Sequence, residues 1–185
     1  NMLDCTYFPP SPFKILLYFP DEDLFYVSPI YERYAFDSYF TVDLTDWEGS
    51  LLVAEASYKY EGEIVSLFIR VVLTILLELG LAWLFGYRER RQLTFLAVVN
   101  LMTQIALNVS LNVINYRSGP WAFVFYYILL ELLVFAVEAG LYREVLPRYS
   151  SKELSTPRIW GYAFVANTVS FVVGLWLAQL IPGIF

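Results

Sequence analysis

Charged side chains that could bind a ligand lie inside otherwise apolar stretches of this sequence. One stretch carries Arg70 and Glu78, and a later one carries Glu131 and Glu138. Ionisable groups at membrane depth are costly, so they indicate a functional site by default. Their carboxyl oxygens suit a hard cation such as Na⁺, Mg²⁺ or Ca²⁺ rather than a soft metal. Clustered carboxyl groups also suit a step coupled to a proton.

Carboxamide side chains accompany these charges. A second apolar stretch holds amides at four-residue spacing, which places them along one slowly rotating stripe of a helix: Asn100, Gln104, Asn108 and Asn112. A fourth stretch carries Asn167, close to Ser170. We therefore predict that a ligand or ion is bound by Glu78, Asn100, Gln104, Glu131, Glu138 and Asn167. Polar support is expected from Arg70, Thr74, Asn108, Asn112 and Ser170.

The polar groups fall at shared depths when about 1.5 Å is counted per helical residue. The inner level, roughly 7–13 Å from the helix ends, has one member from each stretch: Glu78, Asn100, Glu138 and Asn167. Gln104 and Glu131 share a level at roughly 18 Å, and Arg70 and Asn108 one at roughly 25 Å. Groups of this kind also act as packing contacts between helices, worth about 0.6–2 kcal/mol each.

Four apolar stretches must position these groups, and each is long enough to cross a hydrocarbon core about 30 Å thick. They cover residues 64–87, 92–116, 121–142 and 159–181. Pro157 and Pro182 flank the last stretch, as is typical of helix boundaries. The sequence thus predicts an all-α transmembrane four-helix bundle over residues 63–185. Small side chains predict close helix packing: Ala166, Ser170, Gly174 and Ala178, with Ala136 and Gly140.

Basic residues orient the predicted bundle, because Lys and Arg concentrate in cytoplasmic loops. The first and third connections carry Arg88, Arg90, Arg91, Arg143, Arg148, Lys152 and Arg158, whereas the second has only Arg117. Both termini are therefore expected outside, and we expect the plasma membrane of a bacterium. Aromatic belts are predicted at helix ends from Trp83, Trp121, Trp160, Trp176, Tyr87, Tyr116 and Tyr142.

Residues 1–62 are acidic and predict a small antiparallel β domain outside the membrane. Residues 13–19 and 24–28 flank a turn that begins at Pro20, which is the pattern of a hairpin. Residues 39–44 alternate like a third strand, and residues 51–60 fit a fourth strand or a helix. Because residue 1 is Asn, we expect that a signal peptide was removed.

Composition excludes several classes of function. Hydrophobic residues make up 58% of the 185 residues, and 12 Lys and Arg against 18 Asp and Glu give a net charge of −6. This balance argues against nucleic acid as a partner, because its recognition needs a basic face. The absence of His removes Ser-His-Asp chemistry and His-ligated metals. The single Cys5 allows no internal disulfide or thiolate cage.

Three classes of function remain open. The first is binding or transport of a cation, a proton or a small polar solute, with a homo-oligomer forming the pathway because four helices are few for a transporter. The second is an accessory subunit that docks onto another membrane protein within a larger complex. The third is an enzyme acting on a lipid, ranked last because Ser110 and Ser170 have no obvious activating base.

Overall fold

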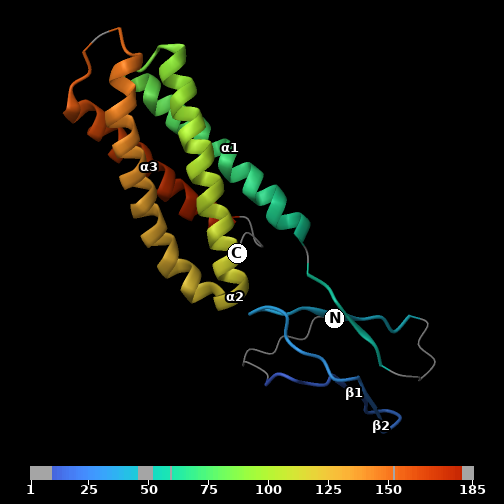
Figure 1. Cartoon of the computed structure of the whole chain (residues 1–185). Helices are drawn as coiled ribbons and strands as arrows, with labels where there is room; N and C mark the ends of the chain where they lie inside the picture. Colours follow the sequence, from blue (N-terminus) through green and yellow to red (C-terminus); the bar gives the residue numbers. More distant parts are fainter. Residues whose placement is uncertain (1–9, 46–51, 59, 152, 181–185) are drawn as a thin grey trace. The chain divides into compact units, whose positions relative to one another are not determined.

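The structure, a computed structural model, describes residues 10–45, 52–58, 60–151 and 153–180 (Figure 1). The chain divides into two compact units, Asn1–Lys59 and Tyr60–Phe185. Several residues discussed above lie outside the described residues: Asn1, Cys5, Lys152 and Pro182.

The first unit contains two small antiparallel sheets. Strands β1 (Leu16–Phe19) and β2 (Leu24–Val27) form the predicted hairpin, in register from Leu16↔Val27 to Phe19↔Leu24. Strands β3 (Phe40–Val42) and β4 (Ala54–Ala56) form the second sheet. The described residues thus form two separate two-stranded sheets rather than one four-stranded sheet. Two strands alone are marginally stable in water, so each sheet depends on side-chain packing.

Aromatic side chains supply that packing in the first unit. The Phe40 ring lies 5.4 Å from the rings of both Phe13 and Tyr31, measured between centroids. On the hairpin, Tyr18 stacks on its cross-strand partner Phe25 at 4.3 Å. Both rings are exposed, so on this face of the hairpin the two side chains pack against each other.

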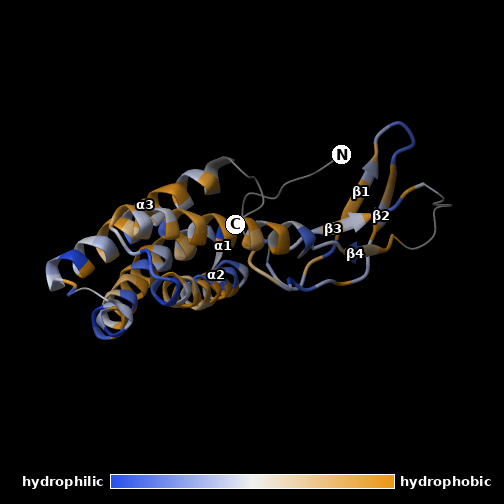
Figure 2. Cartoon of the chain, turned by 90° about the horizontal axis from the view of Figure 1, so that it is seen from above, coloured by the Kyte–Doolittle hydropathy of each residue, from blue (hydrophilic) through white to orange (hydrophobic). Residues whose placement is uncertain are grey.

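The second unit consists of helices α1 (Tyr60–Leu84), α2 (Arg90–Val145) and α3 (Thr156–Leu180), with the short 3₁₀ helix η1 (Leu146–Tyr149). Within the described residues, α1, α2 and α3 are the three helices long and apolar enough to cross a membrane. Figure 2 shows hydrophobic residues along the helices and hydrophilic residues gathered near the connections. The prediction of four separate helices differs from this result, because the second and third predicted stretches both fall within α2.

Helix α2 doubles back on itself at Gly119. This residue has φ 80° and ψ −178°, a non-helical conformation, and Pro120 follows it. Thr103 and Glu138, 35 positions apart on α2, are joined by a 2.6 Å hydrogen bond. A straight helix would separate them by roughly 50 Å. The two arms of α2, residues 90–118 and 120–145, therefore lie side by side (Figure 1).

Helix α1 ends three residues earlier than predicted, because Gly86 adopts φ 85° and turns the chain toward α2. Arg158, from the first turn of α3, donates from its Nε to the Phe85 carbonyl oxygen over 2.7 Å. A Cβ at position 86 would meet the Arg158 guanidinium. The absence of a side chain at Gly86 thus allows α3 to be tied to the end of α1.

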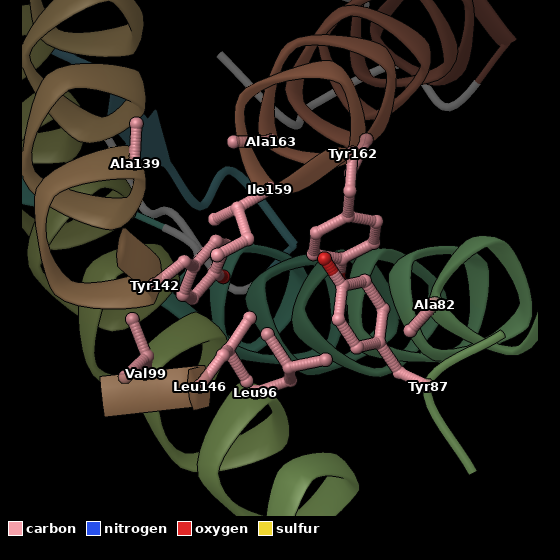
Figure 3. Close-up of a cluster of buried hydrophobic side chains, with 11 residues drawn as sticks. Ala82, Tyr87, Leu96, Val99, Ala139, Tyr142, Leu146, Ile159, Tyr162 and Ala163 are labelled. Carbon is pink, nitrogen blue, oxygen red and sulfur yellow. The ribbon is translucent and has the colours of Figure 1, made fainter. Parts of the chain in front are cut away.

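The main core of this unit combines very small residues with large aromatic ones (Figure 3). The small members come from α1, the second arm of α2, and α3, and all are fully buried: Ala82, Ala139, Ala163 and Ala166. Tyr162 packs against the rings of Tyr87 at 5.1 Å and Tyr142 at 5.7 Å. Small side chains let the helix backbones approach closely, and the tyrosine rings fill the space at one end.

Two sequence expectations about surface and core are corrected here. Tyr87 and Tyr142, predicted as belt residues, are fully buried, because their rings belong to the core that contains Tyr162. The four tryptophans predicted as belt residues, by contrast, are exposed, most of all Trp121 at 88%. Ala136 and Gly140 face outward, and the small residue that packs in the core from this arm is Ala139.

Candidate functional site

The carboxyl group of Glu138, on the second arm of α2, lies at the centre of a buried polar cluster. Its side chain has 0% exposure. Thr103 Oγ1 donates to Glu138 Oε1 over 2.6 Å, and Asn167 Nδ2 donates to Oε2 over 2.9 Å. Both α2 arms and α3 therefore meet at this carboxyl group, and each of its oxygens accepts a hydrogen bond.

Glu78 supplies the second carboxyl group of this cluster from α1. It is 1% exposed, and its carboxyl group lies beside Asn100 and Ser170 and within electrostatic range of Glu138. Among the residues that the structure describes, Glu78 Oε2 has no hydrogen-bond partner of ordinary geometry, although polar groups of Asn100 and Ser170 lie near the carboxyl group. The two glutamates are thus equally buried but differ in their partners, since each carboxyl oxygen of Glu138 has a hydrogen-bond partner and Glu78 Oε2 has none among the described residues.

Asn100 also has a side-chain oxygen without a hydrogen-bond donor among the described residues. Its Nδ2 donates to the Leu96 carbonyl oxygen at 3.0 Å and to the Tyr142 hydroxyl at 3.1 Å. Its Oδ1 is buried and has no donor within the described part of the chain. Burying an acceptor without a donor costs about 1–3 kcal/mol. Two such oxygens, Asn100 Oδ1 and Glu78 Oε2, occur in neighbouring side chains of one cluster.

A second polar group lies farther along the same helices. Arg70 Nη1 donates to Asn108 Oδ1 over 3.4 Å, and Asn108 Nδ2 donates to the Gln104 carbonyl oxygen over 2.8 Å. The Tyr127 hydroxyl lies close to the carboxyl group of Glu131, which is half-buried. A cavity of about 20 Å³ lies among these groups, with polar lining from Arg70, Thr74, Gln104, Asn108, Glu131 and Ser170.

Most of the residues proposed from the sequence are therefore brought into two neighbouring groups. The inner group gathers Glu78, Asn100, Glu138, Asn167 and Ser170, and the outer group gathers Arg70, Thr74, Gln104, Asn108 and Glu131. Asn112 is half-buried and is not among the residues that line the cavity. That the inner and outer groups bind a ligand stays a prediction.

Sequence reasoning did not assign Thr103, Tyr127, Tyr142 and Tyr162 to the site. The hydroxyl of Tyr162 donates to the Glu78 backbone oxygen over 3.3 Å, and the hydroxyl of Tyr142 accepts from Asn100 Nδ2 and lies close to Glu138. A spacing signal was present for two of them. Tyr142 follows Glu138 by four residues, and Tyr127 precedes Glu131 by four, so each shares a helix face with a glutamate.

The donor set limits which ions fit. Among the described residues there is no group of three or more His, Cys, Asp or Glu side chains that could hold a metal ion. Ca²⁺ prefers six to eight oxygen ligands, often with several carboxylates, and Mg²⁺ requires a near-octahedral shell. Two carboxyl groups with amide and hydroxyl oxygens are a better match to a proton or a monovalent hard cation.

No protein-family model, curated protein or solved structure matches this chain. The described part of the chain has three long apolar helices and buried polar side chains between them, features that are compatible with a membrane protein. Any function has to be inferred from the chemistry of the buried side chains.

Proposed function

We propose that this chain is an integral membrane protein that binds a proton or a monovalent hard cation between its helices, with Glu78 as the central ligand group. The observation that carries the proposal is that two neighbouring side chains each have a buried acceptor with no donor among the described residues, Glu78 Oε2 and Asn100 Oδ1. Two acceptors cannot satisfy each other. A proton or a cation within reach of both oxygens would supply each with the partner that it lacks.

A proton and a cation would act differently at this point. A proton bonded to a Glu78 oxygen makes the carboxyl group a hydrogen-bond donor, and Asn100 Oδ1 can accept that hydrogen bond. A Na⁺ ion would instead accept lone pairs from both oxygens, with the Ser170 hydroxyl as a further ligand. In either case the hydrogen bonds from Thr103 and Asn167 hold Glu138 in place.

The proposal includes a membrane topology with four crossings, made by α1, the two arms of α2, and α3. Each arm of α2 is roughly 40 Å long, which is sufficient to cross a bilayer. The arginines of the α1–α2 and α2–α3 connections favour that end as the cytoplasmic side, with the N-terminus outside.

The topology is tested with single cysteines in a Cys5→Ser background. The cysteine of Arg88→Cys should react with a membrane-impermeant reagent only from the cytoplasmic side, and that of Ser118→Cys only from outside. Labelling of both positions from the same side would overturn the topology.

The ligand is tested by replacing Glu78 with glutamine. A ligand that binds only the folded state at about 100 times its dissociation constant stabilises it by about 2.7 kcal/mol. For a chain of this size that corresponds to roughly 5–10 °C in the midpoint of thermal unfolding. If the ligand is a proton, we expect the unfolding midpoint of the purified protein to rise by this amount when the pH is lowered from about 8 to about 5. If the ligand is Na⁺, we expect the same rise when Na⁺ replaces choline in the buffer. The Glu78→Gln variant should show neither response.

The control is Glu144→Gln, which removes an exposed carboxyl group from the same helix that carries Glu138. It should keep the response of the unchanged protein. If neither pH nor Na⁺ shifts the wild-type midpoint, or if Glu78→Gln responds as the wild type does, Glu78 is not the ligand group.

A further inference from the structure

The cavity between the helices adjoins the proposed binding group, and one residue belongs to both. Ser170 on α3 lines the cavity, and its hydroxyl also lies beside the Glu78 carboxyl group. Glu131 lines the cavity from the second arm of α2. Ser170 thus borders both the Glu78 carboxyl group and the cavity that Glu131 lines.

The cavity has the size to hold a single water molecule, and about half of its lining residues are polar. Its volume is about 20 Å³, and a water needs about 10–15 Å³ measured in this way. A buried water also needs two to four polar partners. Thr74, Gln104, Glu131 and Ser170 supply both donors and acceptors at this position, from all three helices.

We infer that the species exchanged at Glu78 is a proton, and that Ser170 and a water in this cavity relay it between Glu131 and Glu78. This inference rests on the proposed function. In the relay, Glu131 releases its proton to the water, and the water passes a proton to Ser170 Oγ. The Ser170 hydroxyl gives its own proton to a Glu78 oxygen. Each oxygen between the two carboxyl groups gains one O–H bond and loses one, so no other reactant is needed.

Charged and titratable groups face Glu78 from each element packed against α1. Helix α2 contributes Glu131, Glu138 and Tyr142, and α3 contributes Tyr162. On α1 itself, Arg70 lies two turns earlier and lines the cavity. Carboxyl groups thus lie on both sides of Ser170, with Glu131 at the cavity and Glu78 beside the hydroxyl, and each of them can hold or release a proton.

Two variants interrupt the relay at different points. Ser170→Ala removes the bridging hydroxyl with little change in volume. Gly174→Ala acts on the cavity, because a Cβ there would lie 2.7 Å from the Tyr127 hydroxyl oxygen, which must shift. The matched control is Ser110→Ala, because Ser110 is an exposed serine whose hydroxyl donates to its own helix at the Ala106 carbonyl oxygen over 2.7 Å.

The test is infrared spectroscopy of the purified full chain after a rapid drop in pH, following the carboxylic-acid band that is absent in Glu78→Gln. We expect Ser170→Ala and Gly174→Ala to show this band at equilibrium but to form it at least about tenfold more slowly than the wild type. Ser110→Ala should form it at the wild-type rate. If the band forms at the wild-type rate in both variants, the relay is wrong although Glu78 still binds a proton. If no band depends on Glu78, the proton as ligand fails as well.

Discussion

Replacing Gly119 with alanine is expected to destabilise the helical unit by about 1–3 kcal/mol, because φ 80° with ψ −178° is a conformation that only glycine adopts readily. The whole reversal of α2 occurs at this residue, with Pro120 directly after it. An alanine must either hold this backbone under strain or move it and misalign the two arms. For a chain of this length the loss corresponds to roughly 2–12 °C in the midpoint of thermal unfolding in detergent.

Gly140→Ala is the matched control, because Gly140 lies inside the second arm of α2 and a Cβ added there meets nothing within 4 Å. Alanine is the better helix former, so this change should leave stability unchanged or raise it by up to about 1 kcal/mol. Equal midpoints for Gly119→Ala and the unchanged protein would show that the reversal does not need a glycine.

Replacing Tyr162 with alanine is expected to cost about 3–5 kcal/mol, the range for deleting a large buried aromatic side chain. Tyr162 is fully buried, and its ring contacts those of Phe85, Tyr87 and Tyr142. Removing the ring leaves a space that these neighbours cannot close without moving. The Tyr142 ring would then lose a support beside Asn100 and Glu138, so the response to pH or Na⁺ should weaken as well.

Tyr162→Phe separates the ring from the hydroxyl. It keeps the packing and removes only the hydrogen bond to the Glu78 backbone oxygen, so about 1 kcal/mol is expected. Chemical or thermal unfolding monitored by tryptophan fluorescence measures both variants. A loss in Tyr162→Phe as large as that in Tyr162→Ala would mean that the hydroxyl, rather than the ring, stabilises this core.

The polar residues of the site were predictable because their chemistry conflicts with their surroundings. A glutamate or an amide within a long apolar stretch is visible in any sequence, and helical rise alone assigned Glu138 and Asn167 to one level and Arg70 and Asn108 to another. Hydrogen bonds join the members of each of these two pairs. The tyrosines were less predictable, because tyrosine occurs equally well at a membrane surface and in a polar core.

The sequence by itself determined that the chain contains long apolar helices, where the β1–β2 hairpin turns, and which side chains are too polar for lipid. These properties depend on hydropathy and on local backbone preferences, which neighbouring residues encode. Only the tertiary structure decided that α2 reverses at Gly119 without a loop, that Tyr87 and Tyr142 are core residues, and that Glu78 Oε2 has no donor within the described part of the chain. Such features depend on which helix faces meet, and residues far apart in the chain set those contacts together.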